Sequence, residues 1–202
     1  MTPSFAMAPS ASSRALGAAG ILGGIVLLSA FVIGIPDGLG DIRLALFIIG
    51  AIAVVSAVHR RQVAVSPGLA RIVAIAAIAA NAVYLARAVV LPNGPWHPFA
   101  GDNGMVLFYA GLAMWITDAA FGFAAMRLGV VIRWGALALA VGSLLAILGM
   151  DRLELTSPAH PTIFGPLSLI GIALNGVGWI LLGLDVMLGG SAVPRLRFVL
   201  AR

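Results

Sequence analysis

The carboxylate of Asp118 stands in the middle of an almost wholly apolar stretch, Met105 to Met126. An ionisable group at membrane depth costs about 2.5–3.5 kcal/mol on insertion scales, and such groups mark ion paths and proton relays. Asn81 and Asn175 occupy similar places in two other apolar stretches. At 1.5 Å of rise per residue, all three lie roughly 13–20 Å from one membrane surface. The pattern predicts a proton- or cation-linked site in which Asp118 titrates and both amides are ligands or partners.

The same amides also allow a structural interpretation. Hydrogen bonds between membrane helices contribute about 0.6 kcal/mol each on average, so Asn81 and Asn175 can serve only to join helices. Tyr84 and Arg87 follow Asn81 on the same stretch. Arg87 can extend to the membrane interface, pair with Asp102 or Glu154, or bind an anion. Tyr84 and Arg87 are therefore candidate substrate- or ion-binding residues together with Asn81.

A second group of candidate catalytic or metal-binding residues lies in two loops between apolar stretches, where His97 and His160 each precede a proline. Two histidines and a carboxylate can bind a divalent metal or perform acid–base chemistry on a lipid headgroup. Their spacing matches no metal motif, and the prolines can simply stiffen these loops. Nearby acids that could complete such a site are Asp102, Asp151 and Glu154.

Several common catalytic and cofactor-binding motifs are absent from the sequence. It has no phosphate-binding loop, dinucleotide fingerprint, HExxH motif or Ser/His/Asp arrangement at a known spacing. It has no cysteine, which excludes disulfides, thiolate metal sites and cysteine nucleophiles. The sequence therefore indicates no particular cofactor and no particular reaction.

The composition is that of a membrane protein. The chain is 61% hydrophobic and 9% charged, whereas a soluble domain has about 25% charged residues. Its net charge of +5 does not indicate nucleic-acid binding, because the basic residues fall in the short gaps between apolar stretches. The basic residues are all arginine, and glycine and alanine are abundant, which is typical of a GC-rich bacterial genome.

Apolar stretches of the length needed to cross about 30 Å of hydrocarbon predict the elements that carry these residues. We expect an all-α integral membrane bundle of six transmembrane helices over residues 16–190. A disordered segment, 1–15, precedes it and a short basic tail, 191–202, follows it. The expected spans are 16–35, 42–58, 69–91, 104–126, 130–149 and 165–188.

The arginines predict the orientation, because arginine accumulates in cytoplasmic segments. With both termini in the cytoplasm, nine of the twelve arginines lie inside and three, Arg43, Arg87 and Arg152, lie outside. This predicts a multi-pass protein of the bacterial inner (plasma) membrane. Asp185, near the inner end of the last span, is expected to reach the headgroup layer or to pair with Arg127 or Arg133. His59, beside Arg60 and Arg61, is expected to join a basic rim that faces anionic lipid.

Three functions remain open from the sequence. The leading one is a small non-enzymatic carrier, or a binding bundle for a small or amphiphilic molecule, with its polar centre at Asp118. The first alternative is an enzyme acting on lipid or isoprenoid at the outer face. The second is an accessory subunit or homo-oligomer, whose glycine and alanine faces, such as Gly20 and Gly24, pack against another chain.

Overall fold

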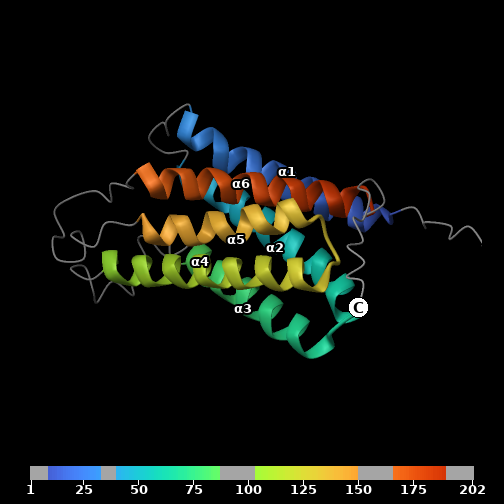
Figure 1. Cartoon of the computed structure of the whole chain (residues 1–202). Helices are drawn as coiled ribbons and strands as arrows, with labels where there is room; N and C mark the ends of the chain where they lie inside the picture. Colours follow the sequence, from blue (N-terminus) through green and yellow to red (C-terminus); the bar gives the residue numbers. More distant parts are fainter. Residues whose placement is uncertain (1–8, 33–39, 87–102, 150–165, 190–202) are drawn as a thin grey trace, which may run out of the picture.

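The structure, a computed structural model, describes residues 9–32, 40–86, 103–149 and 166–189. This part of the chain is all-helical and holds six helices (Figure 1). They are α1 (Ala11–Val32), α2 (Gly40–Val63), α3 (Pro67–Leu85), α4 (Asn103–Leu128), α5 (Arg133–Leu148) and α6 (Pro166–Met187).

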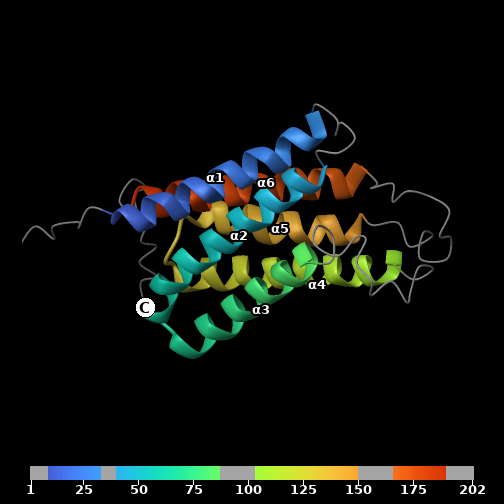
Figure 2. The same cartoon turned by 180° about the vertical axis from the view of Figure 1, so that it is seen from behind.

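The helices form an up-and-down bundle in which each packs against the next along the chain, while α6 also packs against α1. Helix α1 lies at one edge and α3 at the other (Figures 1 and 2). The largest fully buried side chains come from the four helices between these edges, and they include Phe47, Phe121, Leu139, Trp179 and Leu182. The apolar core therefore lies among α2, α4, α5 and α6.

The outer surface of the bundle is apolar as well. Ile72, Ile75, Trp134 and Leu148 are each at least 65% exposed. In the described part of the chain, four helices have the length and hydropathy to cross a membrane, namely α1, α2, α3 and α6, and α5 is a shorter apolar helix. These apolar helices indicate a protein embedded in a membrane.

Helix α1 begins at Ala11, five residues before the expected start at Leu16. The hydroxyl of Ser10 accepts the backbone N–H of Ser13 at 3.2 Å, as an N-cap residue does. Residues 11–15, expected in the disordered segment, are therefore helical. The serine cap therefore starts the helix in the polar residues that precede its apolar part.

Helix α2 continues to Val63, five residues beyond the expected end at Val58. Its last turn contains Arg60 and Arg61, and cations are favourable at a helix C-terminus. Helix α3 is described as far as Leu85, short of the expected 91. The expected ends of the other three helices differ from the observed ones by no more than three residues.

Glycines bring α6 close to two neighbours. On one side Gly183 and Gly176 face Gly17 and Gly24 of α1, where a Cβ on Gly24 would lie 2.7 Å from the Gly176 carbonyl oxygen. On its other side α6 meets α5, where a Cβ on Gly171 would lie 2.7 Å from a carbonyl oxygen of α5. The backbone of α6 is therefore in direct contact with the backbone of α1 on one side and that of α5 on the other, as small residues at membrane helix interfaces allow.

Candidate functional site

The polar centre of the bundle is a hydrogen bond between α3 and α4. Asn81 Nδ2 donates to Asp118 Oδ1 at 2.9 Å and also to the Ala77 carbonyl of its own helix at 2.9 Å. Both side chains are fully buried. The other buried residues of α3 are alanines, so this face of the helix is flat. Small side chains let α4 approach closely enough for Asn81 to reach Asp118.

This pair leaves two acceptors without a donor. Within the described part of the chain, neither Asp118 Oδ2 nor Asn81 Oδ1 has a hydrogen-bond partner. Buried polar side-chain atoms are normally paired, and leaving one unpaired costs about 1–3 kcal/mol. The cost of burying this carboxylate with an unpaired oxygen can be lowered by a proton or by a bound cation, because either one neutralises the negative charge.

Asn175, the third predicted residue, makes its hydrogen bond elsewhere. It is fully buried on α6 and donates to Ser143 Oγ of α5 at 2.9 Å. Ser143 in turn donates to the Leu139 carbonyl at 2.8 Å. The oxygen of the Asn175 amide has no partner among the described residues. Sequence reasoning missed Ser143, although a lone serine within an apolar helix was the available signal.

An aromatic contact connects the helices that carry these two polar groups. Phe121 of α4 and Trp179 of α6 are stacked, with ring centroids 6.5 Å apart and planes 20° from parallel. Helices α4 and α6 run in the same direction (Figures 1 and 2). Asp118 and Asn175 each precede their aromatic residue by about one helical turn. The stack therefore sets both at a similar depth, as the rise per residue predicted, although the aromatic contact itself was not predicted.

The remaining predicted residues are only partly described. Tyr84 is half-buried, and a Cβ on Gly111 of α4 would lie 3.3 Å from its ring. It therefore packs on the same two helices as the Asn81–Asp118 pair. Arg87, His97 and His160 lie outside the described residues, so their roles stay predictions. Within the described ranges, no group of three or more histidines and acids could hold a metal ion.

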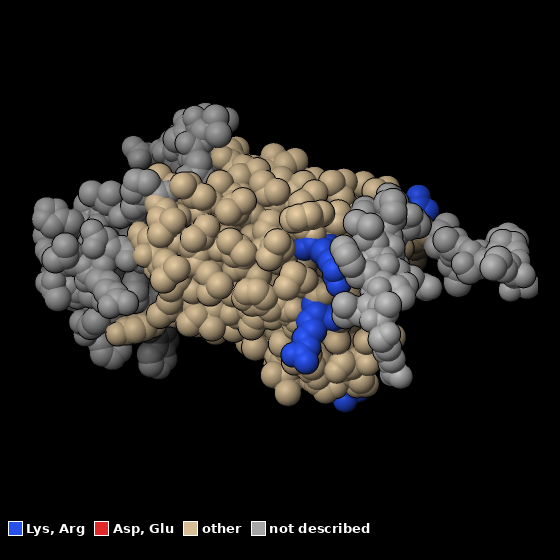
Figure 3. Space-filling model, in the orientation of Figure 1, with Lys and Arg blue, Asp and Glu red and all other residues tan. Residues whose placement is uncertain are grey.

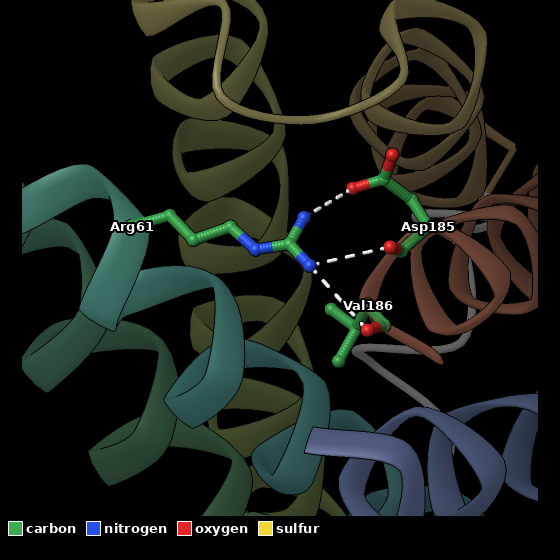
Figure 4. Close-up of polar contacts among 3 residues, drawn as sticks. All are labelled: Arg61, Asp185 and Val186. Carbon is green, nitrogen blue, oxygen red and sulfur yellow. Dashed lines mark hydrogen bonds and ion pairs between the residues drawn. The ribbon is translucent and has the colours of Figure 1, made fainter. Parts of the chain in front are cut away.

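At the end of the bundle where α2 leads into α3, an ion pair joins α2 to α6 (Figure 4). Arg61 Nη1 donates to Asp185 Oδ2 at 2.6 Å, and Nη2 donates to the Asp185 carbonyl at 3.2 Å. The sequence analysis expected Asp185 to reach the headgroup layer or to pair with Arg127 or Arg133 instead. That expectation assumed that α2 ended before Arg61, whereas the longer helix carries this side chain to α6.

Two neighbours of Arg61 on α2 are also buried or in contact with another helix, and one of them, His59, was expected in a basic rim. Gln62 is fully buried, and neither end of its amide has a partner in the part of the chain that is described. The His59 ring nitrogen Nδ1 lies 3.1 Å from the Ala70 carbonyl of α3. His59 therefore contacts the start of α3 rather than only solvent or lipid headgroups.

Comparison with known proteins leaves the function to be argued from this geometry. No protein-family model, no curated protein and no solved structure matches the chain. Functions reside in sites rather than in folds, so the buried polar groups are the basis of the argument.

Proposed function

We propose that this protein is a small membrane carrier that takes up and releases a proton or small cation at Asp118, with Asn81 as its partner. The observation that carries the proposal is the half-satisfied carboxylate: one oxygen bonded to Asn81, the other without a donor among the described residues. An aspartate kept only to join helices would have its acceptors filled, as buried polar groups usually do. Intramembrane carboxylates of this kind belong to ion and proton pathways.

In this proposal the chain crosses a bacterial plasma membrane six times, with both termini in the cytoplasm. The support is the distribution of arginine. In Figure 3 the visible arginines gather at the end where α2 leads into α3 and α4 into α5. No acidic side chain of the described residues shows on the face in view. Arg43 lies near the start of α2, at the other end. The described arginines at the arginine-rich end are Arg14, Arg60, Arg61, Arg71, Arg127 and Arg133.

Helix α3 is the element suited to give access to the site. It lies at the edge of the bundle, and apart from Asn81 its buried residues are Ala70, Ala74 and Ala77. Little side-chain interlocking therefore resists a small sliding movement of α3 along α4, the kind of shear seen between packed helices. Such a shift would separate Asn81 from Asp118 and open the carboxylate to one side of the membrane.

Transport across vesicles tests the proposal. The purified protein is placed in phosphatidylethanolamine–phosphatidylglycerol vesicles with a trapped pH-sensitive dye, and gradients of pH, Na⁺ or K⁺ are imposed. We expect the wild type to move protons or cations, and Asp118→Asn to lose this movement. Thr117→Val is the matched control, because Thr117 bonds only the carbonyls of its own helix among the contacts described. Equal flux through the wild type and Asp118→Asn would contradict the proposal.

The accessory-subunit alternative draws no support from the glycines. Gly20 would place a Cβ against Val54 of α2, and Gly24 packs on α6. These faces are already occupied by helices of the same chain, so docking to a partner would need another surface. The outer-face enzyme depends on His97 and His160, which lie outside the described residues.

A further inference from the structure

We infer that the ion exchanged at this site is a proton, and that protonated Asp118 pairs with Asn81 through two reciprocal hydrogen bonds. In this pair Asn81 Nδ2 donates to Asp118 Oδ1, as it does in the structure at 2.9 Å, and a proton on Asp118 Oδ2 is donated to Asn81 Oδ1. The inference rests on the proposed function, which leaves a proton and a small cation as alternatives. It adds that the loaded site is the one that holds α3 and α4 together most firmly.

The hydrogen-bonding needs of the pair match a single proton. Asp118 Oδ2 and Asn81 Oδ1 are buried without a partner among the described residues, and both are acceptors. A proton on Asp118 Oδ2 turns one of these acceptors into the donor that the other lacks. It also removes the negative charge, whose burial in an apolar setting is costly. Formation of one O–H bond therefore satisfies both atoms, and no further ligand is required.

The shapes of the two side chains permit this arrangement. A carboxyl group and an amide are both planar forks with two polar atoms on one carbon, and planar forks can form two parallel hydrogen bonds. One of the two bonds already exists between Asn81 and Asp118. The terminal torsions of both residue types are broad, so a rotation can align the second bond. Asn81 Nδ2 has two hydrogens, so its bond to the Ala77 carbonyl at 2.9 Å is kept.

The other unpaired polar atoms of the described residues lie on different helices. Asn175 Oδ1 and Trp179 Nε1 belong to α6, and both ends of the Gln62 amide belong to α2. The amide of Asn175 is bonded to Ser143 of α5. A hard divalent cation normally takes about six or more ligands. In their described parts, α3 and α4 offer only two unpaired buried side-chain oxygens, those of the pair. A proton needs no more than these two.

The charged groups on the helices around Asp118 lie toward the ends of the bundle. Helix α4 packs against α2, α3 and α5, and it contacts α6 through Phe121. Tyr84 of α3 is about one turn from Asn81, and a phenol is neutral at ordinary pH. Arg127 lies roughly 13 Å further along α4 than Asp118. The other described charged or titratable residues of these helices are His59, Arg60, Arg61, Arg71, Arg133 and Asp185 at the arginine-rich end, and Asp41, Arg43 and Tyr109 toward the other end.

The proton then controls the contact between α3 and α4. When Asp118 is protonated, two hydrogen bonds join the helices. When the proton passes to water, one bond remains, and a charged oxygen and an amide oxygen are left side by side without a donor. Release of the proton therefore favours the sliding movement of α3 that opens the site. The proton is both the transported ion and the link that closes the site.

Infrared spectroscopy of the purified protein in detergent tests the pair directly. A protonated carboxyl group and a carboxylate absorb at different frequencies, and subtraction of the spectrum of Asp118→Asn isolates Asp118 from the other acids. We expect a protonated-carboxyl band from Asp118 at neutral pH that disappears as the pH is raised. Asn81→Ala should shift its frequency, because both bonds of the carboxyl group are lost. A carboxylate band at neutral pH, or a band that Asn81→Ala does not move, would overturn the inference.

The matched control for the band shift is Gln62→Ala. Gln62 is also a buried amide without a partner in the described residues, but it lies near the end of α2. This change should leave the Asp118 band where it is. An equal shift in Gln62→Ala and Asn81→Ala would mean that the band reports a general loosening of the bundle, and the reciprocal pair would lose its support.

Thermal unfolding provides a second test through a side chain that imitates the protonated state. Asp118→Asn replaces one carboxylate oxygen with an NH₂ group, which can donate to Asn81 Oδ1 at every pH. At high pH this variant should be at least as stable as the wild type. Asp118→Ala, which cannot form either bond, should have a Tm about 2–4 °C below that of Asp118→Asn. Equal Tm values for Asp118→Asn and Asp118→Ala would show that the reciprocal pair does not form.

The proton pair and the carrier can fail separately. The expected band and its shift, without any flux in vesicles, would contradict the carrier and leave the proton pair standing. Na⁺ or K⁺ flux that requires Asp118, from a protein without the protonated-carboxyl band at neutral pH, would overturn this inference and leave the carrier standing.

Discussion

Asn81 uses both hydrogens of its side-chain amide, one on the Ala77 carbonyl of α3 and one on the Asp118 carboxylate of α4. The first bond fixes the amide against its own helix, and the second makes it the link to the next helix. The orientation of the amide is therefore determined, and its oxygen is left without a donor among the described residues. A side chain with this arrangement can join two helices and still offer a ligand.

Removal of Asn81 should destabilise the bundle more than removal of a single membrane hydrogen bond usually does. Asn81→Ala leaves a buried carboxylate with no donor, and we expect a loss of about 1–3 kcal/mol in the free energy of unfolding. Asp118→Ala combined with Asn81→Ala should cost less than the two single changes added together, with a coupling of about 0.6–1.7 kcal/mol. Unfolding in detergent measures this cycle. Strict additivity would show that the bond contributes no coupling.

The ion pair at the arginine-rich end makes a second prediction. Arg61→Ala leaves Asp185, whose side chain is only 6% exposed, without this guanidinium and also removes a donor to the end of α6. We expect a loss of about 1–3 kcal/mol, because a buried carboxylate that loses a charged hydrogen-bond donor is destabilised. Arg61→Lys should restore only part of it, since one ammonium cannot reproduce the planar fork.

Arg60 provides the matched control for this prediction. It precedes Arg61 on the same helical turn, carries the same charge and is exposed. Arg60→Ala should leave the unfolding temperature unchanged. If both alanine variants lowered it equally, the effect would come from net charge at this end of the bundle rather than from the contact with α6.

The close contact between α1 and α6 predicts a strong effect of one methyl group. A Cβ on Gly24 would lie 2.6 Å from the Ile180 side chain and 2.7 Å from the Gly176 carbonyl oxygen. We expect Gly24→Ala to destabilise the protein by about 1–3 kcal/mol, because overpacking forces neighbouring atoms apart. Gly68→Ala is the control, since a Cβ there meets nothing within 4 Å. In a helix that change should be neutral or stabilising by up to about 1 kcal/mol.

Cysteine labelling tests the orientation, and the chain suits it because it contains no cysteine of its own. Ala64 is exposed between α2 and α3 at the arginine-rich end. Ala64→Cys should react with a membrane-impermeant maleimide only after the cells are opened. Ala159→Cys, in the connection expected outside, should react in intact cells. The reverse pattern would mean that both termini face outward.

The sequence predicted where the apolar helices lie because each is a long stretch with a clear composition. It also placed Asn81 and Asp118 at similar depths, and the structure brings them together. Depth follows from the rise per residue. The direction in which a side chain points across the bundle depends on the packing of other helices, which no single stretch specifies. For that reason the hydrogen bond from Asn175 to Ser143 was not predicted.

The error over Asp185 has a different origin. Charged residues usually mark the membrane surface, so the His59-Arg60-Arg61 cluster predicts the end of a span. Helix α2 continues through it, so Arg61 faces α6 while Arg60 remains exposed. Adjacent residues of a helix point in directions about 100° apart, so Arg60 and Arg61 have different surroundings. Composition alone does not show which of the two faces α6.

The glycine contacts of α6 also bear on how the protein is assembled. Among the described helices α1 is synthesised first, and one of its packing partners, α6, is synthesised last. During synthesis the face of α1 that contains Gly17 and Gly24 stays exposed to lipid until the next four described helices and α6 have been inserted. The contact between α6 and α1 can therefore form only late in translation, and a chain that stops before α6 would leave the glycine faces of both α1 and α5 uncovered.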